Sequence, residues 1–173
     1  MMNLPIPQLT IRLYGDPCLR AKCEPVEEIG IVEKLLVEAM IDTMDRHKGI
    51  GLAAPQVGVN KRILVADIGD GPVAMINPVI KEIKGEAVME EGCLSIPEVN
   101  VNVTRPAVIR VSYTDLNNRP RERKFKELMA RVILHENDHL DGKLITDYAT
   151  AEELKKYAEV LKKLEDLQQK KSG

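Results

Sequence analysis

Two parts of the chain show apolar residues at helical spacing. In the first, apolar side chains return every three or four positions and Gly49 follows as a stop, which predicts an amphipathic helix over about residues 28–47. The stripe of this helix is expected to contain Ile31, Leu35, Ala39, Met40, Thr43 and Met44. In the second, residues 127–140 show the same spacing and predict a helix that is buried over much of its circumference.

The region between these helices predicts strands. Residues 62–68 and 73–80 are short apolar segments separated by the turn sequence GDGP, and residues 82–92 continue the run toward Cys93. Residues 107–126 alternate around the turn sequence LNNRP and predict a hairpin. Residues 49–58, GIGLAAPQVG, predict a loop whose backbone passes close to another group.

The C-terminal tail predicts one further helix over about residues 150–170. Thr150 is its candidate N-cap, and Leu154, Tyr157, Ala158, Leu161 and Leu164 follow at helical spacing. Helices and strands occur in separate blocks with no linker or repeat between them. We therefore expect one α+β domain over residues 1–173, with short antiparallel or mixed sheets packed around the helix at 127–140.

Composition narrows the class of protein. The chain has 44% hydrophobic and 30% charged residues and a net charge of -2, which is typical of a globular protein with no general attraction for DNA or anionic membranes. It has one Phe and no Trp, so it offers little for stacking on bases. The N-terminal segment lacks the features of a secretion signal, and no apolar run could span a bilayer, so a cytoplasmic location is expected.

Candidate chemistry lies in the sequence HENDH at residues 135–139. His135 and His139 are one helical turn apart, so both imidazoles can reach one metal ion, while Glu136 can stand beside that ion without binding it. This arrangement is typical of metal hydrolases. A catalytic ion of this kind takes three protein ligands and leaves one position open, so a third ligand is needed.

Several groups are candidates for that third ligand. A histidine six residues after His139 is excluded because Ile145 stands there, and His47 ends a charged segment and is expected at the surface. The downstream acids Glu152, Glu153 and Glu165 fit the solvated face of the tail helix.

The three cysteines are Cys18, Cys23 and Cys93, an odd number that does not suggest a disulfide framework. Cys93 follows Gly92 in a polar turn and can supply a thiolate, although most free cysteines are buried small apolar residues. Cys18 and Cys23 have no nearby histidine and are expected to be incidental.

Three segments in this order, GIGLAAPQ at 49–56, EGCLS at 91–95 and HENDH at 135–139, resemble the three motifs of the peptide deformylase family. The likeness extends over essentially the whole chain and is closest to the type 1, bacterial and organellar branch. It implies removal of formate from N-formylmethionyl nascent peptides. It also implies that Cys93, His135 and His139 bind the metal and that Glu136 is the general acid and base. Gln56 and the backbone N–H of Leu94 would donate to the formyl oxygen.

The resemblance also implies a pocket for the methionine side chain and an extended peptide that binds like an added strand. Its lining residues would be Gly49, Ile50, Gly51, Met89, Leu128, Arg131 and Val132. Arg131 departs from the family, which often has an apolar residue there. We expect it to narrow the pocket or to give it a polar rim through a guanidinium that extends toward solvent.

The resemblance implies one divalent ion, with Fe²⁺ as the first expectation and Zn²⁺, Ni²⁺ or Co²⁺ compatible with the same ligands. It further suggests transient contact with the ribosome, for which the tail offers Lys155, Lys156, Lys162, Lys163, Lys170 and Lys171. A zinc metallopeptidase that uses a distant glutamate, a non-catalytic homologue that binds formylated peptides, and a structural zinc site remain the alternatives.

Overall fold

The computed structural model describes residues 5–172, so the first four residues of the N-terminal segment, in which we expect no secretion signal, lie outside it. The helices are α1 (Ile31–Arg46), α2 (Glu127–Leu140), α3 (Ala151–Lys156) and α4 (Ala158–Ser172), and the 3-10 helices are η1 (Pro17–Leu19), η2 (Ala54–Val57) and η3 (Ile145–Tyr148). The strands are β1 (Gly51–Ala53), β2 (Ile63–Ala66), β3 (Val73–Lys84), β4 (Ala87–Cys93), β5 (Ile96–Arg105), β6 (Val108–Thr114) and β7 (Pro120–Lys126). The predicted α+β class is confirmed.

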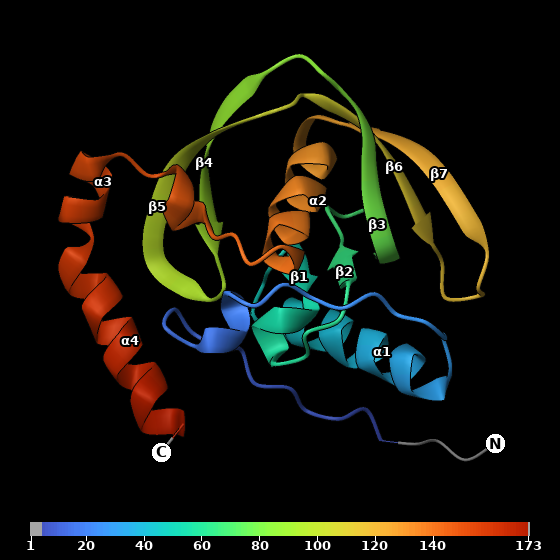
Figure 1. Ribbon diagram of the computed structural model, residues 1–173, viewed down its shortest axis with the longest axis horizontal. Coiled ribbons are helices and arrows are strands. Elements are labelled where there is room, and N and C mark those ends of the chain that lie inside the picture. The colour runs from blue at the N-terminus through green and yellow to red at the C-terminus, as the bar shows by residue number, and fades with distance from the viewer. Residues whose placement is uncertain (1–4, 173) are drawn as a thin grey trace.

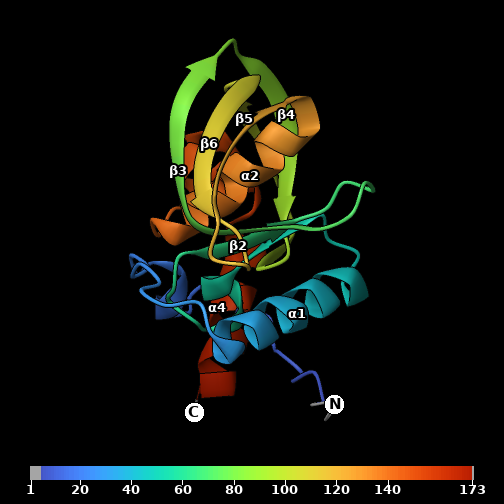
Figure 2. The ribbon, with the colours of Figure 1, turned by 90° about the vertical axis from the view of Figure 1, so that its right-hand side faces the viewer.

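Two antiparallel sheets enclose α2. One sheet has five strands in the order β1-β2-β3-β6-β7, and the other consists of β4 and β5. Figure 1 shows that the chain arches over α2 twice, from β3 into β4 and from β5 into β6, so the helix lies between the two sheets. Turned by 90°, the view in Figure 2 shows α1 beneath β2 and away from the arch. The predicted central helix and the predicted hairpin are therefore both present.

Strands β1 and β2 are buried on both faces. Ala53 and Leu64 pack toward α2 in one apolar cluster, whereas Leu52 and Val65 belong to a second cluster with α1. Burial on both sides explains why residues 63–66 form a continuous apolar run instead of an alternating one.

The N-terminal helix occupies most of its predicted range, and Ala39, Met40, Thr43 and Met44 of the predicted stripe are buried, but the first turn of the stripe is not. Ile31 is exposed in the first turn and Leu35 is only partly buried. Val37, which was not part of the predicted stripe, is buried in the cluster with Met40 and Met44. The apolar contacts of α1 are thus concentrated in its C-terminal half.

Two other predictions fail locally. Residues 49–58 are not a loop, because they contain β1 and η2 and most of them are buried. The tail is not a single helix. Thr150 caps α3 by accepting a hydrogen bond from the Glu153 N–H (3.1 Å), as expected, but the helix is interrupted at Tyr157 before α4.

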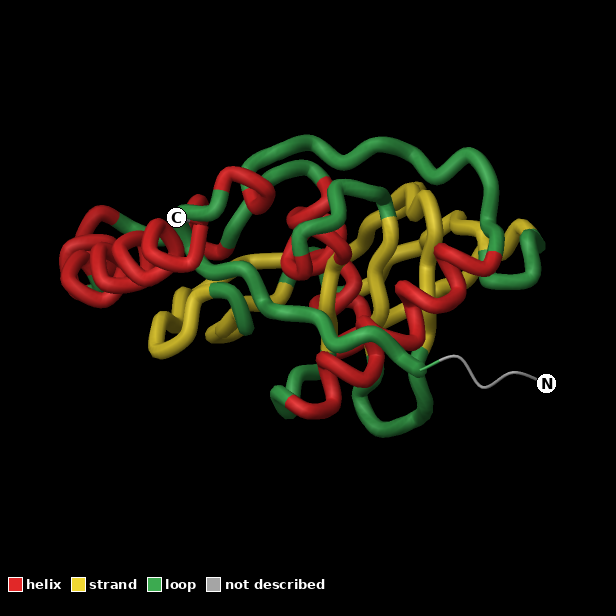
Figure 3. Tube along the Cα trace, turned by 90° about the horizontal axis from the view of Figure 1, so that it is seen from below, coloured by secondary structure: helices red, strands yellow, loops and turns green. Residues whose placement is uncertain are grey.

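The C-terminal helix α4 packs against β5. Leu161 and Leu164 pack in a third apolar cluster with Val99 and Val101 of β5. Figure 3 shows α3 and α4 together at one end of the molecule, beside the β4–β5 strands. Strand β5 was not predicted, although its burial alternates along most of its length. In the part of the chain that the structure describes, no helix is long and apolar enough to cross a membrane.

Candidate functional site

Helix α2 presents the two histidines of the HENDH sequence on one side. Ala130, Ile133 and Leu140 bury its other side in the core. The imidazole rings of His135 and His139 lie 5.1 Å apart between centroids, as expected for residues one turn apart. Burial, followed by the nearby His135, lowers the pKa of His139 well below its usual value, which favours the neutral imidazole that a metal ion requires.

Cys93 brings a thiol to these imidazoles from the end of β4. The candidate ligand atoms of Cys93, His135 and His139 lie within 4.8 Å of one another, and Cys93 Sγ is 3.4 Å from His139 Nε2. Among the described residues, this is the one group of three potential ligands close enough to hold a single ion. One sulfur and two nitrogens suit a divalent transition metal and leave a coordination position open. The donor set therefore fits the implied metal.

The turn between β4 and β5 explains how Cys93 reaches this position. Glu91 pairs with Val101, but Cys93 pairs with Ile96, so the register shifts between the two pairs. An irregularity of this kind re-aims the side chains that follow it.

The other candidate ligands do not join this group. His47 is exposed at the end of α1, where its Nδ1 is 2.8 Å from the Thr43 carbonyl. Glu152 and Glu153 lie on α3, and Glu165 lies on α4. The metallopeptidase alternative thus has no third ligand among these glutamates.

Glu136 is a buried carboxyl group beside the ligand cluster. Its Oε1 lies 4.0 Å from His135 Nε2, and its Oε2 has no hydrogen-bond partner among the described residues. Burial raises its pKa to about 7, which suits a group that both accepts and returns a proton near neutral pH. Gly51 makes room for it, because a Cβ at that position would lie 2.6 Å from Glu136 Oε1.

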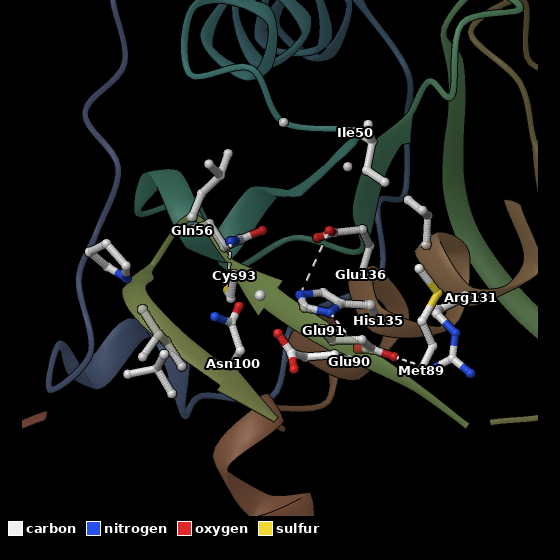
Figure 4. A pocket seen from close by; sticks show the side chains of 18 of the residues that line it. Ile50, Gln56, Met89, Glu90, Glu91, Cys93, Asn100, Arg131, His135 and Glu136 are labelled. Atoms are coloured by element: carbon white, nitrogen blue, oxygen red, sulfur yellow. Dashed lines mark hydrogen bonds and ion pairs between the residues drawn. The ribbon is translucent and has the colours of Figure 1, made fainter. Parts of the chain in front are cut away.

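The side-chain amide of Gln56 is oriented by the backbone of Ala53 at the end of β1. Its Oε1 accepts a hydrogen bond from the Ala53 N–H at 2.9 Å, which turns the Nε2 donor toward Ser95 Oγ (3.2 Å) and Cys93 Sγ (3.5 Å). Figure 4 shows this amide pointing at Cys93. The predicted oxyanion donor therefore faces the candidate ligand Cys93, and Leu94 follows Cys93 directly in the same turn.

Glu91 is the first residue of the EGCLS motif, but the motif alone predicted no role for it. Its Oε1 is 2.9 Å from His135 Nδ1 and accepts from Arg105 Nη2 (2.9 Å), while its Oε2 accepts from Arg105 Nε (2.7 Å) and Arg131 Nη1 (2.6 Å). Burial favours the protonated acid, but hydrogen bonds from His135 and Arg105 outweigh it and lower the pKa of Glu91 to about 2. Glu91 is therefore an ionised carboxylate that orients the imidazole of a candidate metal ligand.

Arg131 does not form the polar rim that we expected. Its side chain is 7% exposed, and its guanidinium binds Glu91, the Val103 carbonyl (2.9 Å) and the Ala87 carbonyl (2.7 Å). In Figure 4, which labels Cys93 and His135, its charged end turns away from these candidate ligands. The expectation of a guanidinium extended toward solvent is wrong, because three acceptors inside the protein hold it.

A pocket of about 500 Å³ opens beside the ligand cluster. Its lining includes Gln56, Cys93, Leu94, His135, Glu136 and all of the predicted methionine-pocket residues, which are Gly49, Ile50, Gly51, Met89, Leu128, Arg131 and Val132. Ile50, Met89 and Leu128 are partly exposed apolar side chains at this pocket. The pocket therefore joins an apolar surface to the candidate metal centre.

Comparison with known proteins agrees with this geometry. The family model described as polypeptide deformylase matches residues 8–155. The peptide deformylase of Dictyoglomus thermophilum is 49% identical, with the alignment covering 84% of this chain and 95% of that protein. The crystal structure of the Thermotoga maritima peptide deformylase is 45% identical with a TM-score of 0.81, covering 83% of this chain and 98% of that one. A plant peptide deformylase structure is 35% identical with a TM-score of 0.90, and the match covers 100% of this chain and 97% of that one. The chain belongs to the polypeptide deformylase family.

Proposed function

We propose that this deformylase removes the formyl group of N-terminal formylmethionine with a divalent ion held by Cys93, His135 and His139. The observation that carries these assignments is the meeting of one thiol, two imidazoles and a buried carboxyl group at one end of a partly apolar pocket. The deformylases are a family of metal-dependent hydrolases, and one thiol with two imidazoles is a donor set that suits such an ion. The non-catalytic alternative is not favoured, because binding alone requires no buried proton acceptor at the ligands.

The chain's own groups divide the work of the reaction. When bound, the ion supplies Lewis acidity for the formyl carbonyl and for an attacking water. Glu136 takes a proton from that water and passes it to the leaving amine. Gln56 Nε2 and the Leu94 N–H donate to the formyl oxygen as its negative charge develops. Glu91 holds the Nδ1 side of His135 during these steps.

The methionine side chain is proposed to bind among the apolar groups of the pocket. Ile50, Met89, Leu128 and Val132 supply apolar surface, and the glycines at 49 and 51 keep the passage to Glu136 open. Strand β1 is an edge strand of its sheet. A peptide that extends along this edge and the segment after Cys93 would gain backbone hydrogen bonds as an added strand.

A formate-release assay tests the reaction and the metal together. Protein purified without oxygen is analysed for metal, reloaded with Fe²⁺, Ni²⁺, Co²⁺ or Zn²⁺, and given formyl-Met-Ala-Ser or its acetylated analogue. We propose Fe²⁺ as the resident ion, because the ligands accept it and a reducing cytoplasm would preserve it. Formate release from the formyl peptide, without any release of acetate from the acetylated analogue, supports the proposal. Absence of release with iron, nickel and cobalt would contradict it.

A ribosomal contact through α3 and α4 is proposed separately. α4 lies outside the range that the family model matches. Together the two helices carry the exposed lysines Lys155, Lys156, Lys162, Lys163, Lys170 and Lys171. Such charges can bind rRNA phosphates in a salt-dependent way. Replacing Lys162, Lys163, Lys170 and Lys171 by Glu should abolish co-sedimentation with ribosomes and leave formate release from a tripeptide unchanged. Equal co-sedimentation of both proteins would contradict the contact.

A further inference from the structure

The candidate metal centre is built from two parts of the chain that belong to different structural units. His135, Glu136 and His139 lie on α2, whereas Cys93 lies at the end of β4. The β4–β5 sheet forms no strand pairing with the five-stranded sheet. The spacing between the thiol and the imidazoles therefore depends on how the β4–β5 sheet is attached to α2.

Arg131 makes the most extensive of these attachments. It lies on α2 one turn before His135, and its guanidinium donates to the backbone carbonyl of Ala87 on β4 and to that of Val103 on β5. The same group donates to the Glu91 carboxylate at 2.6 Å. One side chain from the helix thus holds both strands of the sheet that carries Cys93.

Glu91 continues this attachment to the metal ligand. The carboxylate oxygen that Arg131 does not reach lies 2.9 Å from His135 Nδ1. Arg105 of β5 binds Glu91 through two nitrogens and reaches Asp138 of α2 at 2.9 Å. Two guanidinium groups and two carboxylates therefore balance in charge within this largely buried cluster. Loss of one cation would leave buried acceptors without a donor.

We propose that Arg131 is a positioning residue for the metal centre: it fixes the β4–β5 sheet against α2 and, through Glu91, fixes His135, so that Cys93 and the imidazoles stay at ligating distance. This inference rests on the proposed metal assignment. It replaces the expectation of a polar rim, because the charged end of Arg131 binds Glu91 and two backbone carbonyls instead of extending into the pocket. Its loss should therefore act on metal retention and kcat more than on KM.

The test compares cobalt-loaded wild type, Arg131→Met, Arg131→Lys and Arg110→Met. Cobalt bound to a thiolate has a characteristic absorption, so its release to a chelator can be followed without any activity assay. Arg110→Met is the control. This substitution also removes an ion pair between an arginine and a glutamate, Glu82, but Arg110 lies outside the pocket lining. Unfolding of each metal-free protein is measured beside it, to separate a general loss of stability from a loss of metal binding.

We expect Arg131→Met to weaken cobalt affinity by about 10- to 100-fold and to change the cobalt spectrum, since partners behind a metal ligand typically have effects of this size. Arg131→Lys keeps the charge beside Glu91 but cannot bind both carbonyls equally well. Its cobalt affinity should therefore lie between that of wild type and that of Arg131→Met. Arg110→Met should match wild type. Equal affinity and spectra in wild type and Arg131→Lys would overturn the proposal, even if Arg131→Met fails to fold. Absence of a thiolate–cobalt spectrum in wild type would contradict the metal assignment instead.

Discussion

The two sheets that enclose α2 are attached to it by different kinds of interaction. On the side of the five-stranded sheet, Leu64 and Ile133 are fully buried in an apolar cluster between strand and helix. On the side of the β4–β5 sheet, the attachments include a chain of charged hydrogen bonds among Glu91, Arg105 and Arg131. Apolar packing is not directional, whereas charged hydrogen bonds fix both distance and angle. The polar side is the one that must hold Cys93 in register with the histidines.

This difference separates stability from geometry. Removing apolar contacts on the first side should lower the free energy of unfolding and leave the ligand spacing of the folded protein unchanged. Removing a charge on the second side should affect both, because the buried partners lose their donor and the sheet loses its anchor. Substitutions on each side can therefore show whether the division holds.

The largest effect is expected at Glu136, which belongs to neither attachment. Glu136→Gln keeps the shape of the side chain but removes the proton acceptor, so kcat should fall by about 10²- to 10⁴-fold. Formate release and cobalt content are measured on the same sample. Because Glu136 is buried without a partner on Oε2, stability should not fall. A loss of cobalt together with activity would show that Glu136 supports the ligands instead of the proton transfer.

Next comes Arg105→Met on the polar side. Arg105 is 5% exposed and pairs with both Glu91 and Asp138, so breaking these pairs should cost about 3–5 kcal/mol of unfolding free energy. Cobalt affinity should fall as well, because Glu91 orients His135. Urea unfolding and chelator competition measure the two effects. A stable variant with unchanged cobalt affinity would show that Arg131 alone holds the β4–β5 sheet.

Leu64→Ala on the apolar side should lower the free energy of unfolding about as much as Arg105→Met does, but it should leave the cobalt affinity unchanged. Leu64 is fully buried, and its truncation should cost about 2–5 kcal/mol. Below the unfolding transition, the cobalt affinity and KM should equal those of wild type. The same urea and chelator measurements apply. A change in cobalt affinity here would remove the distinction between the two sides of α2.

The sequence predicted the parts of the fold that depend on regular spacing. The helices at 28–47 and 127–140 and the hairpin at 107–126 were found because their apolar positions repeat locally. The β1 segment was misread because Gly49 and Gly51 suggest a turn, whereas they are small there to admit neighbouring side chains. A Cβ on Gly49 would meet Leu94 at 2.8 Å, and one on Gly51 would meet Glu136. Such contacts arise between segments far apart in the chain.

The candidate metal ligands and the pocket residues lie close together, as the motifs implied, but the contacts that support them were not foreseen. Glu91 lies in a run of polar residues, and its partners Arg105 and Arg131 are 14 and 40 positions away. Local spacing carries no sign that these charges are buried together. The wrong expectation for Arg131 has the same cause, since an arginine beside a pocket normally extends toward solvent unless acceptors inside the protein hold it.

The smallest effect is expected at the outer end of the polar attachment. The Tyr148 hydroxyl donates to Asp138 at 2.6 Å, and burial followed by this carboxylate raises the pKa of Tyr148 to about 12. A phenol of unfolded chain ionises near pH 10, so the neutral form is favoured by folding. Its contribution should be full below about pH 10 and disappear as the pH rises to about 12.

The difference in unfolding free energy between wild type and Tyr148→Phe measures this contribution. It should stay below about 1 kcal/mol at pH 8, because Tyr148 is 39% exposed and solvent screens the contact. The difference should shrink from pH 10 upward, since the ionised phenol repels Asp138. Cobalt affinity should remain that of wild type, because Arg105 still joins Asp138 to Glu91. A difference that grows with pH would mean that Tyr148 does not donate to the carboxylate, and the polar attachment would then end at Asp138.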